Sequence, residues 1–149
     1  MKHLKNHPFL VLAILWTIVI FAFSLQSADE SIITSNILLD FLANLFPILK
    51  DPQNLDIVIL ILRKTAHFTE YFILGYFYTK ASEETKQDQI LVVGYLIPII
   101  DESIQLFSPG RSGQAVDMVI DMAGYLTGLI VFKSFSRLVK IFKKNWTGK

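Results

Sequence analysis

Arg63-Lys64-Thr65-Ala66-His67-Phe68-Thr69-Glu70-Tyr71 is a charged stretch inside an otherwise apolar part of the chain. Apolar residues precede it from Ile57 to Leu62 and follow it from Phe72 to Tyr78. Residues 57–79 together are long enough to cross a bilayer as a helix, which needs roughly 20 residues. Each charge inside such a helix costs roughly 2.5–3.5 kcal/mol on membrane-insertion scales. These two cations, one imidazole and one carboxylate therefore need partners elsewhere in the fold.

Composition places the chain among integral membrane proteins. Its 149 residues are enough for one domain, 52% of them are hydrophobic, and the mean hydropathy is +0.47. An ordinary soluble domain of this length is less apolar. The absence of cysteine excludes disulfides, thiolate nucleophiles and cysteine-ligated metals. No basic stripe with interleaved aromatic residues is present in the sequence, so we expect no nucleic-acid partner.

The hydropathy pattern predicts an all-α, polytopic membrane protein with a single domain over residues 1–149. Its transmembrane bundle consists of four helices, at about residues 8–24, 57–79, 89–107 and 114–132. A cleaved signal peptide is the alternative for the first helix, because small residues follow it at 24–28. We expect the helix to be retained, since the later spans need an inward N-terminus. A short hydrophilic loop is predicted at 80–88.

A fifth helix, amphipathic and extracytoplasmic, is predicted at about residues 35–47. Apolar side chains recur along it at helical spacing, Ser35 or Asn36 could cap its start, and Pro47 ends it. It is short for a span and contains polar residues. We expect it to lie on the membrane surface or over the mouth of the bundle.

The distribution of Lys and Arg predicts the orientation of the bundle. The N-terminus carries two cations and the basic tail, residues 133–149, carries six, whereas the segment between the first two spans carries one Lys and five acids. The positive-inside rule places both termini in the cytoplasm, which four spans allow. The amphipathic helix and the turn at 108–113 then lie outside.

This orientation brings the charged residues of three spans to a similar depth, in the outer half of the membrane. Helical spacing also places Arg63 with His67 and Asp117 with Asp121 one turn apart on their helices. The resulting cluster contains three cations, five carboxylates, an imidazole and an amide: Arg63, Lys64, Arg111, Glu70, Asp101, Glu102, Asp117, Asp121, His67 and Gln105.

Glycines suggest where the backbone must come close or turn. Gly124 and Gly128 form a G-x-x-x-G pair below Asp121, which predicts a closely packed partner helix. Gly110 and Gly113 follow Pro109 and are typical of a turn.

The ordered motifs Arg63-Lys64-x-x-His67-Phe68-x-Glu70-Tyr71-x-x-Leu74-Gly75, Asp101-Glu102-x-x-Gln105-x-Phe107-x-Pro109-Gly110-Arg111-x-Gly113-x-x-x-Asp117 and Gly124-x-x-x-Gly128 resemble the VanZ-like family of small bacterial membrane proteins. The resemblance covers about residues 10–132. It departs at Asp121, where many relatives are expected to have Asn. It implies a place in the bacterial cytoplasmic membrane and a role in the cell envelope, because the family's named member is linked to teicoplanin resistance. It brings no agreed reaction.

We interpret the cluster as an outward-facing polar pocket that affects glycopeptide susceptibility by binding an anionic headgroup, of a membrane lipid or of a lipid-linked cell-wall precursor. Arg and Lys suit such anions. The expected binding residues are Arg63, Lys64, Gln105, Arg111, Asp117 and Asp121. His67, Glu70, Asp101 and Glu102 would orient the ligand or act on it as catalytic residues.

Two other classes of function stay open. One is a membrane enzyme acting on a lipid-linked or phosphate substrate, with His67 as acid–base. The other is a non-catalytic scaffold in which the charges only hold the helices together. No metal site is expected, because no tight His-x-x-x-His or Asp-x-Asp spacing occurs. The sequence leaves the cofactor, the substrate and the oligomeric state undefined.

Overall fold

The computed structural model describes residues 7–46, 55–111 and 114–147, and within these ranges helices are the only regular secondary structure. It forms five helices: α1 (Pro8–Ser24), α2 (Ala28–Leu45), α3 (Leu55–Thr85), α4 (Gln89–Gln105) and α5 (Ala115–Thr147). The predicted all-α class is confirmed. Pro47, the predicted end of the amphipathic helix, lies outside the described residues, as do the N-terminal cations Lys2 and Lys5 and the predicted turn residue Gly113.

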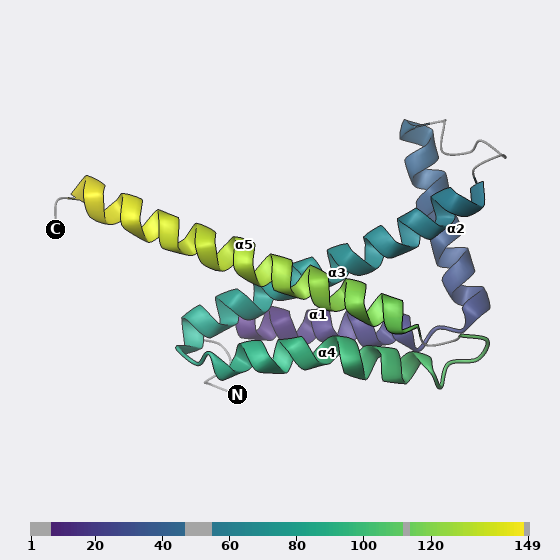
Figure 1. Ribbon diagram of the computed structural model, residues 1–149, viewed down its shortest axis with the longest axis horizontal. Helices are drawn as coiled ribbons and strands as arrows, with labels where there is room; N and C mark the ends of the chain where they lie inside the picture. The colour runs from purple at the N-terminus through teal and green to yellow at the C-terminus, as the bar shows by residue number, and fades with distance from the viewer. Residues whose placement is uncertain (1–6, 47–54, 112–113, 148–149) are drawn as a thin grey trace.

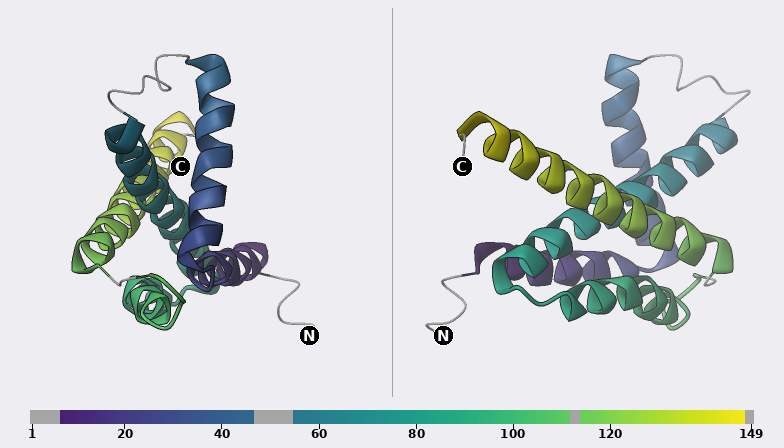
Figure 2. Two further views of the ribbon diagram at one scale, coloured as in Figure 1. Left: turned by 90° about the vertical axis from the view of Figure 1, so that its right-hand side faces the viewer. Right: turned by 60° about the vertical axis from the view of Figure 1, so that its left-hand side comes forward.

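The helices cross rather than stand in parallel. Figure 1 shows α1 and α4 side by side, with α3 and α5 crossing over them, while α2 turns steeply away from α1. The start of α1, the α3–α4 connection and the end of α5 lie toward one side of the molecule. The α1–α2 and α4–α5 connections lie toward the other side, and Figure 2 shows the same separation.

The start of α2 corrects the prediction. The helix begins at Ala28, not near residue 35, and Ser27 is its N-cap. Ser27 Oγ accepts a hydrogen bond from the Glu30 backbone N–H at 3.3 Å, and the Glu30 carboxylate accepts from the Ser27 backbone N–H at 2.8 Å. These contacts form a capping box. Hydrogen bonds from Ser27 hold the pKa of Glu30 below its usual value.

One other predicted boundary is also corrected. Residues 80–85 continue α3, where a hydrophilic loop was predicted. The basic tail, for which no secondary structure was predicted, continues α5 to Thr147. In α3, Lys80 Nζ donates to Glu83 Oε2 at 3.0 Å and to Ser136 Oγ of α5 at 2.9 Å. The charges of this segment are therefore satisfied within a helix and by its neighbour, so the chain has no need to leave the helix there.

The core lies where α1, α3, α4 and α5 meet. Its largest buried side chains include Tyr71, Leu74 and Tyr125, none of which is exposed to solvent. α3 and α5 approach most closely along a row of glycines. A Cβ atom on Gly124 would overlap the carbonyl oxygen of Phe68, and one on Gly128 would overlap that of Phe72. The predicted packing role of the G-x-x-x-G pair is confirmed, and its partner is α3.

Within the described residues, one helix alone is long and apolar enough to cross a membrane, over Ala115–Lys143 in α5. α1 and α2 are long and apolar enough to cross a membrane only when they are taken together as one span, with a bend of 114° between them. α1 and α4 have 17 residues each, and at about 1.5 Å per residue such helices are shorter than a hydrocarbon core of roughly 30 Å. The polytopic four-span bundle therefore stays a prediction.

Candidate functional site

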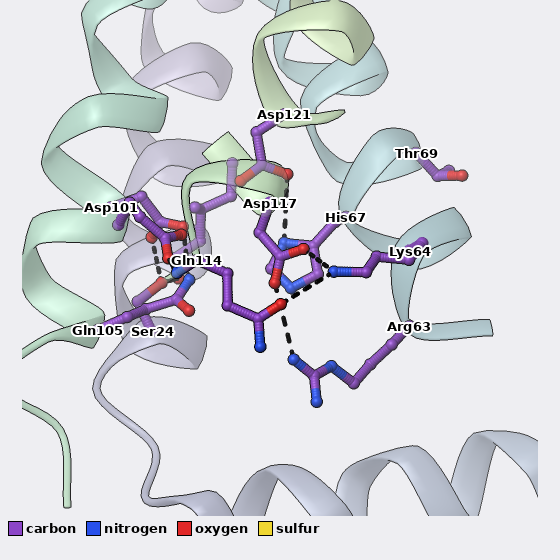
Figure 3. Close-up of polar contacts among 12 residues, drawn as sticks. Ser24, Arg63, Lys64, His67, Thr69, Asp101, Gln105, Gln114, Asp117 and Asp121 are labelled. Carbon is purple, nitrogen blue, oxygen red and sulfur yellow. Dashed lines mark hydrogen bonds and ion pairs between the residues drawn. The ribbon is translucent and has the colours of Figure 1, made fainter. Parts of the chain in front are cut away.

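The predicted cluster comes from three helices and one connection. Arg63, Lys64, His67 and Glu70 lie on α3, and Asp101, Glu102 and Gln105 lie at the end of α4. Arg111 follows α4, and Asp117 and Asp121 lie in the first turns of α5. Figure 3 shows most of these side chains converging where the end of α4 and the start of α5 meet α3.

Lys64 and Asp117 join α3 to α5. Lys64 Nζ lies in direct contact with Asp117 Oδ1, and it also donates to Gln114 Oε1 at 3.5 Å. Arg63 Nη2 is 3.7 Å from Asp117 Oδ2. The Asp117 side chain is 3% exposed, so its charge depends on these two cations. The close pair, Lys64 with Asp117, therefore belongs to the helix interface (Figure 3).

His67 and Asp121 form a second link between α3 and α5. His67 Nδ1 lies 3.2 Å from Asp121 Oδ1, and Asp121 has no exposed surface. The two atoms are close enough for an ion pair but are not aligned for a hydrogen bond. A fully buried carboxylate requires a donor or a cation, and the imidazole is placed to supply one.

The carboxylates of α4 act as acceptors for backbone and side-chain donors. Asp101 accepts from Ser24 Oγ of α1, and from Gln105 Nε2 at 3.1 Å. Glu102 accepts from the backbone N–H of Gln114, just before α5. Such a bond satisfies one of the free N–H groups at a helix start. Both carboxylates thus help to position neighbouring helices.

A cavity of about 150 Å³ lies beside this cluster, between the end of α1, α2, α3 and the end of α4. Six of the predicted residues line it: Arg63, His67, Glu70, Asp101, Gln105 and Arg111. Lys64, Glu102, Asp117 and Asp121 do not. The structure therefore separates the predicted set into residues that face the cavity and residues that join the helices.

Arg111 donates one hydrogen bond within the described part of the chain and has N–H donors to spare. Its Nη1 donates to the backbone oxygen of Phe23 at 3.2 Å, near the end of α1. Guanidinium has five N–H donors, and Arg111 forms no ion pair with an acid among the residues that the structure describes. Burial and the nearby positive charge of Arg63 lower the pKa of Arg111. Two cations thus lie close to one another at the cavity wall.

Arg63 is also incompletely satisfied. Its ion pair with Asp117, at 3.7 Å, is longer than a charged hydrogen bond. Its Nε is buried without a hydrogen-bond partner in the described part of the chain. Arg63 and Arg111 therefore have positive charge and unused N–H donors at the cavity wall. Lys64, in contrast, is closely paired with Asp117.

The polar face of α2 is a part of the site that the sequence reading missed. Ser31, Thr34 and Ser35 line the cavity, together with Ser24 and Gln26 from the end of α1. The prediction of this helix rested on its apolar stripe and on its expected ends. The spacing 31, 34, 35 is itself helical, so this polar stripe was a readable signal.

The described residues contain no group of three or more His, Asp or Glu side chains arranged to hold a metal ion. The cavity can receive an anion, because its wall carries two guanidinium groups with N–H donors to spare.

The family model described as VanZ/LLP1 matches residues 9–139, most of the chain. No curated protein matches the chain, and no solved structure does.

Proposed function

The chain belongs to the VanZ/LLP1 family, and from this premise we propose that it is a multi-pass protein of the bacterial cytoplasmic membrane that binds an anionic headgroup. The headgroup belongs to a membrane lipid or to a lipid-linked cell-wall precursor, and its binding affects susceptibility to teicoplanin-type glycopeptides. The observation that carries the proposal is the pair Arg63 and Arg111, two incompletely satisfied cations at the wall of one cavity.

Exposed apolar side chains support the membrane location. Only 28% of the most apolar stretch of α5 is buried within the protein. α1 and α4 likewise expose large hydrophobic side chains, including Leu15, Ile18, Val92 and Val93, at 52–61%. Apolar surface on this scale is unfavourable in water and favourable against lipid.

The arrangement of the helix ends supports the predicted topology. The start of α1, the α3–α4 connection and the end of α5 lie toward one side of the molecule (Figure 1). The cytoplasmic basic tail is on that side, so the cavity, near the α1–α2 and α4–α5 connections, opens on the extracytoplasmic face. A headgroup on the outer leaflet would reach it there.

Single replacement of Arg111 or His67 by Ala should reduce teicoplanin tolerance toward that of a strain lacking the protein. Arg111→Ala removes a cation from the cavity wall, and His67→Ala removes the imidazole that lines it. The measurement is the minimal inhibitory concentration of teicoplanin, in a strain whose tolerance depends on this protein. Arg137→Ala, at an exposed position of α5, is the matched control and should leave tolerance unchanged. Full tolerance in both cavity variants, at normal membrane levels, would refute the proposal.

A second candidate is a membrane enzyme, favoured by the His67–Asp121 pair. A carboxylate beside one imidazole nitrogen fixes the ring, as it does for general bases, and the His67 side chain lines the cavity. If the cavity is an active site, the purified protein should release product from a lipid-linked phosphate substrate, and His67→Gln should abolish turnover while retaining binding. The assay is run with and without divalent cations. No turnover in either condition counts against this candidate.

A further inference from the structure

A second cavity, of about 100 Å³, adjoins the first. Both are lined by Ser31, Arg63, Gln105 and Arg111, so the two spaces share this part of their walls. We propose that they form one bipartite site for an amphiphile whose phosphoryl group is internal: it carries an alkyl chain on one side and an uncharged polar group on the other. This inference rests on the proposed function and specifies the class of ligand.

The walls of the two cavities differ in chemistry. The wall of the larger cavity includes five large apolar side chains, from α1, α2 and α3: Ile20, Phe23, Leu38, Ile59 and Leu62. Phe23 and Leu38 are 42% and 38% exposed, so this apolar wall continues to the outside of the protein. An alkyl chain can lie along it and leave toward the lipid without losing apolar contact.

Among the described residues, none that lines the smaller cavity has a large apolar side chain. Besides the four shared residues, its wall consists of Ala28, Gly110 and Gln114. The amides and Ser31 offer both donors and acceptors, which suits hydroxyl groups. Holding one water needs about 10–15 Å³, so this space has room for roughly half a dozen heavy atoms. A cationic headgroup would be repelled by the two guanidinium groups.

The shared side chains determine where the anion lies. Arg63 and Arg111 border both spaces and have unused N–H donors, so a phosphoryl group fits between the apolar and the polar compartments. A terminal phosphate would leave the smaller compartment without a ligand group. A phosphodiester, or a pyrophosphate substituted at both ends, fills both compartments.

The test compares two short-chain lipids that differ only at the phosphate. Dihexanoyl phosphatidylglycerol has an internal phosphate with a polyol headgroup, and dihexanoyl phosphatidic acid has a terminal phosphate. Binding to the full-length protein in a neutral detergent is measured by native mass spectrometry. We expect phosphatidylglycerol to bind about tenfold or more tightly. Charge alone favours phosphatidic acid, whose terminal phosphate carries roughly one more negative charge.

Two matched substitutions assign the compartments. Ala28→Leu fills only the smaller cavity and should weaken phosphatidylglycerol binding while leaving phosphatidic acid unchanged. Ala66→Leu fills only the larger cavity and should weaken both lipids. If Ala28→Leu does not fold, as judged by its melting temperature, Gln114→Ala takes its place, because it removes polar lining from the smaller cavity alone.

The possible results separate this inference from the proposed function. Preference for phosphatidylglycerol that disappears in Ala28→Leu or Gln114→Ala supports the bipartite site. Equal binding, or tighter binding of phosphatidic acid, with both lost in Arg111→Gln, overturns the bipartite site and leaves the anion site intact. Binding of both lipids that does not change in Arg111→Gln overturns the proposed function as well.

Discussion

Gly124→Val and Gly128→Val are each expected to destabilise the protein by about 3 kcal/mol or more, the upper end for overpacked positions. A Cβ atom at either position would overlap a backbone carbonyl oxygen of α3, on Phe68 or Phe72. A backbone atom cannot move to another rotamer, so α3 and α5 would have to separate. Separation would also draw Asp117 and Asp121 away from their partners on α3.

The measurement is the melting temperature of the purified protein, followed by tryptophan fluorescence. Trp16 is a suitable reporter, because its Nε1 donates to the backbone oxygen of Glu70 at 2.9 Å and so connects α1 to α3. Thr127→Val introduces the same side chain at an exposed position of α5 and should change stability little. Melting temperatures for Gly124→Val and Gly128→Val equal to that of Thr127→Val would show that the helices do not pack as described.

Asp117→Ala is the second large expected effect, a loss of about 3 kcal/mol, the lower end for breaking a buried ion pair. Lys64 has a side chain that is 23% exposed, and this partial exposure to solvent places the expected loss at the lower end. Without Asp117, Lys64 and Arg63 keep positive charge at the α3–α5 interface with no counter-ion at that position. The melting temperature should fall, and the fall should depend on the loss of the pair rather than of volume.

The double substitution Lys64→Met with Asp117→Leu is the matched control. Replacing both partners by apolar side chains of similar size removes the unpaired charge, and such changes are often neutral or stabilising. Since neither residue lines either of the two cavities described above, the double variant should also keep anion binding. If stability recovers but binding is lost, Lys64 takes part in recognition directly. If Asp117→Ala melts like the parent protein, the pair does not hold the helices.

Local sequence was enough to predict some features and was misread for others. The apolar runs and the G-x-x-x-G pair predicted the all-α class and a close helix contact. The capping box at Ser27 and Glu30 was also readable, because Ser-x-x-Glu is its pattern, but the apolar stripe drew the predicted start toward residue 35. The ends of α3 and α5 were harder to predict from local sequence, because Lys80 is satisfied by Ser136, a residue far along the chain.

The packing of the helices determines which charged residues of the cluster pair with one another and which line the cavities. Arg63 and Lys64 are adjacent in the sequence, and both were expected to bind the anion. Successive residues point about 100° apart around a helix, so only one of the two can face Asp117 closely. The rotation and depth of α3 against α5 select Lys64 for that pair and leave Arg63 at the cavities with Arg111. Spacing along one helix determines which side chains share a face, whereas contacts between helices determine which charges are paired and which are left for a ligand.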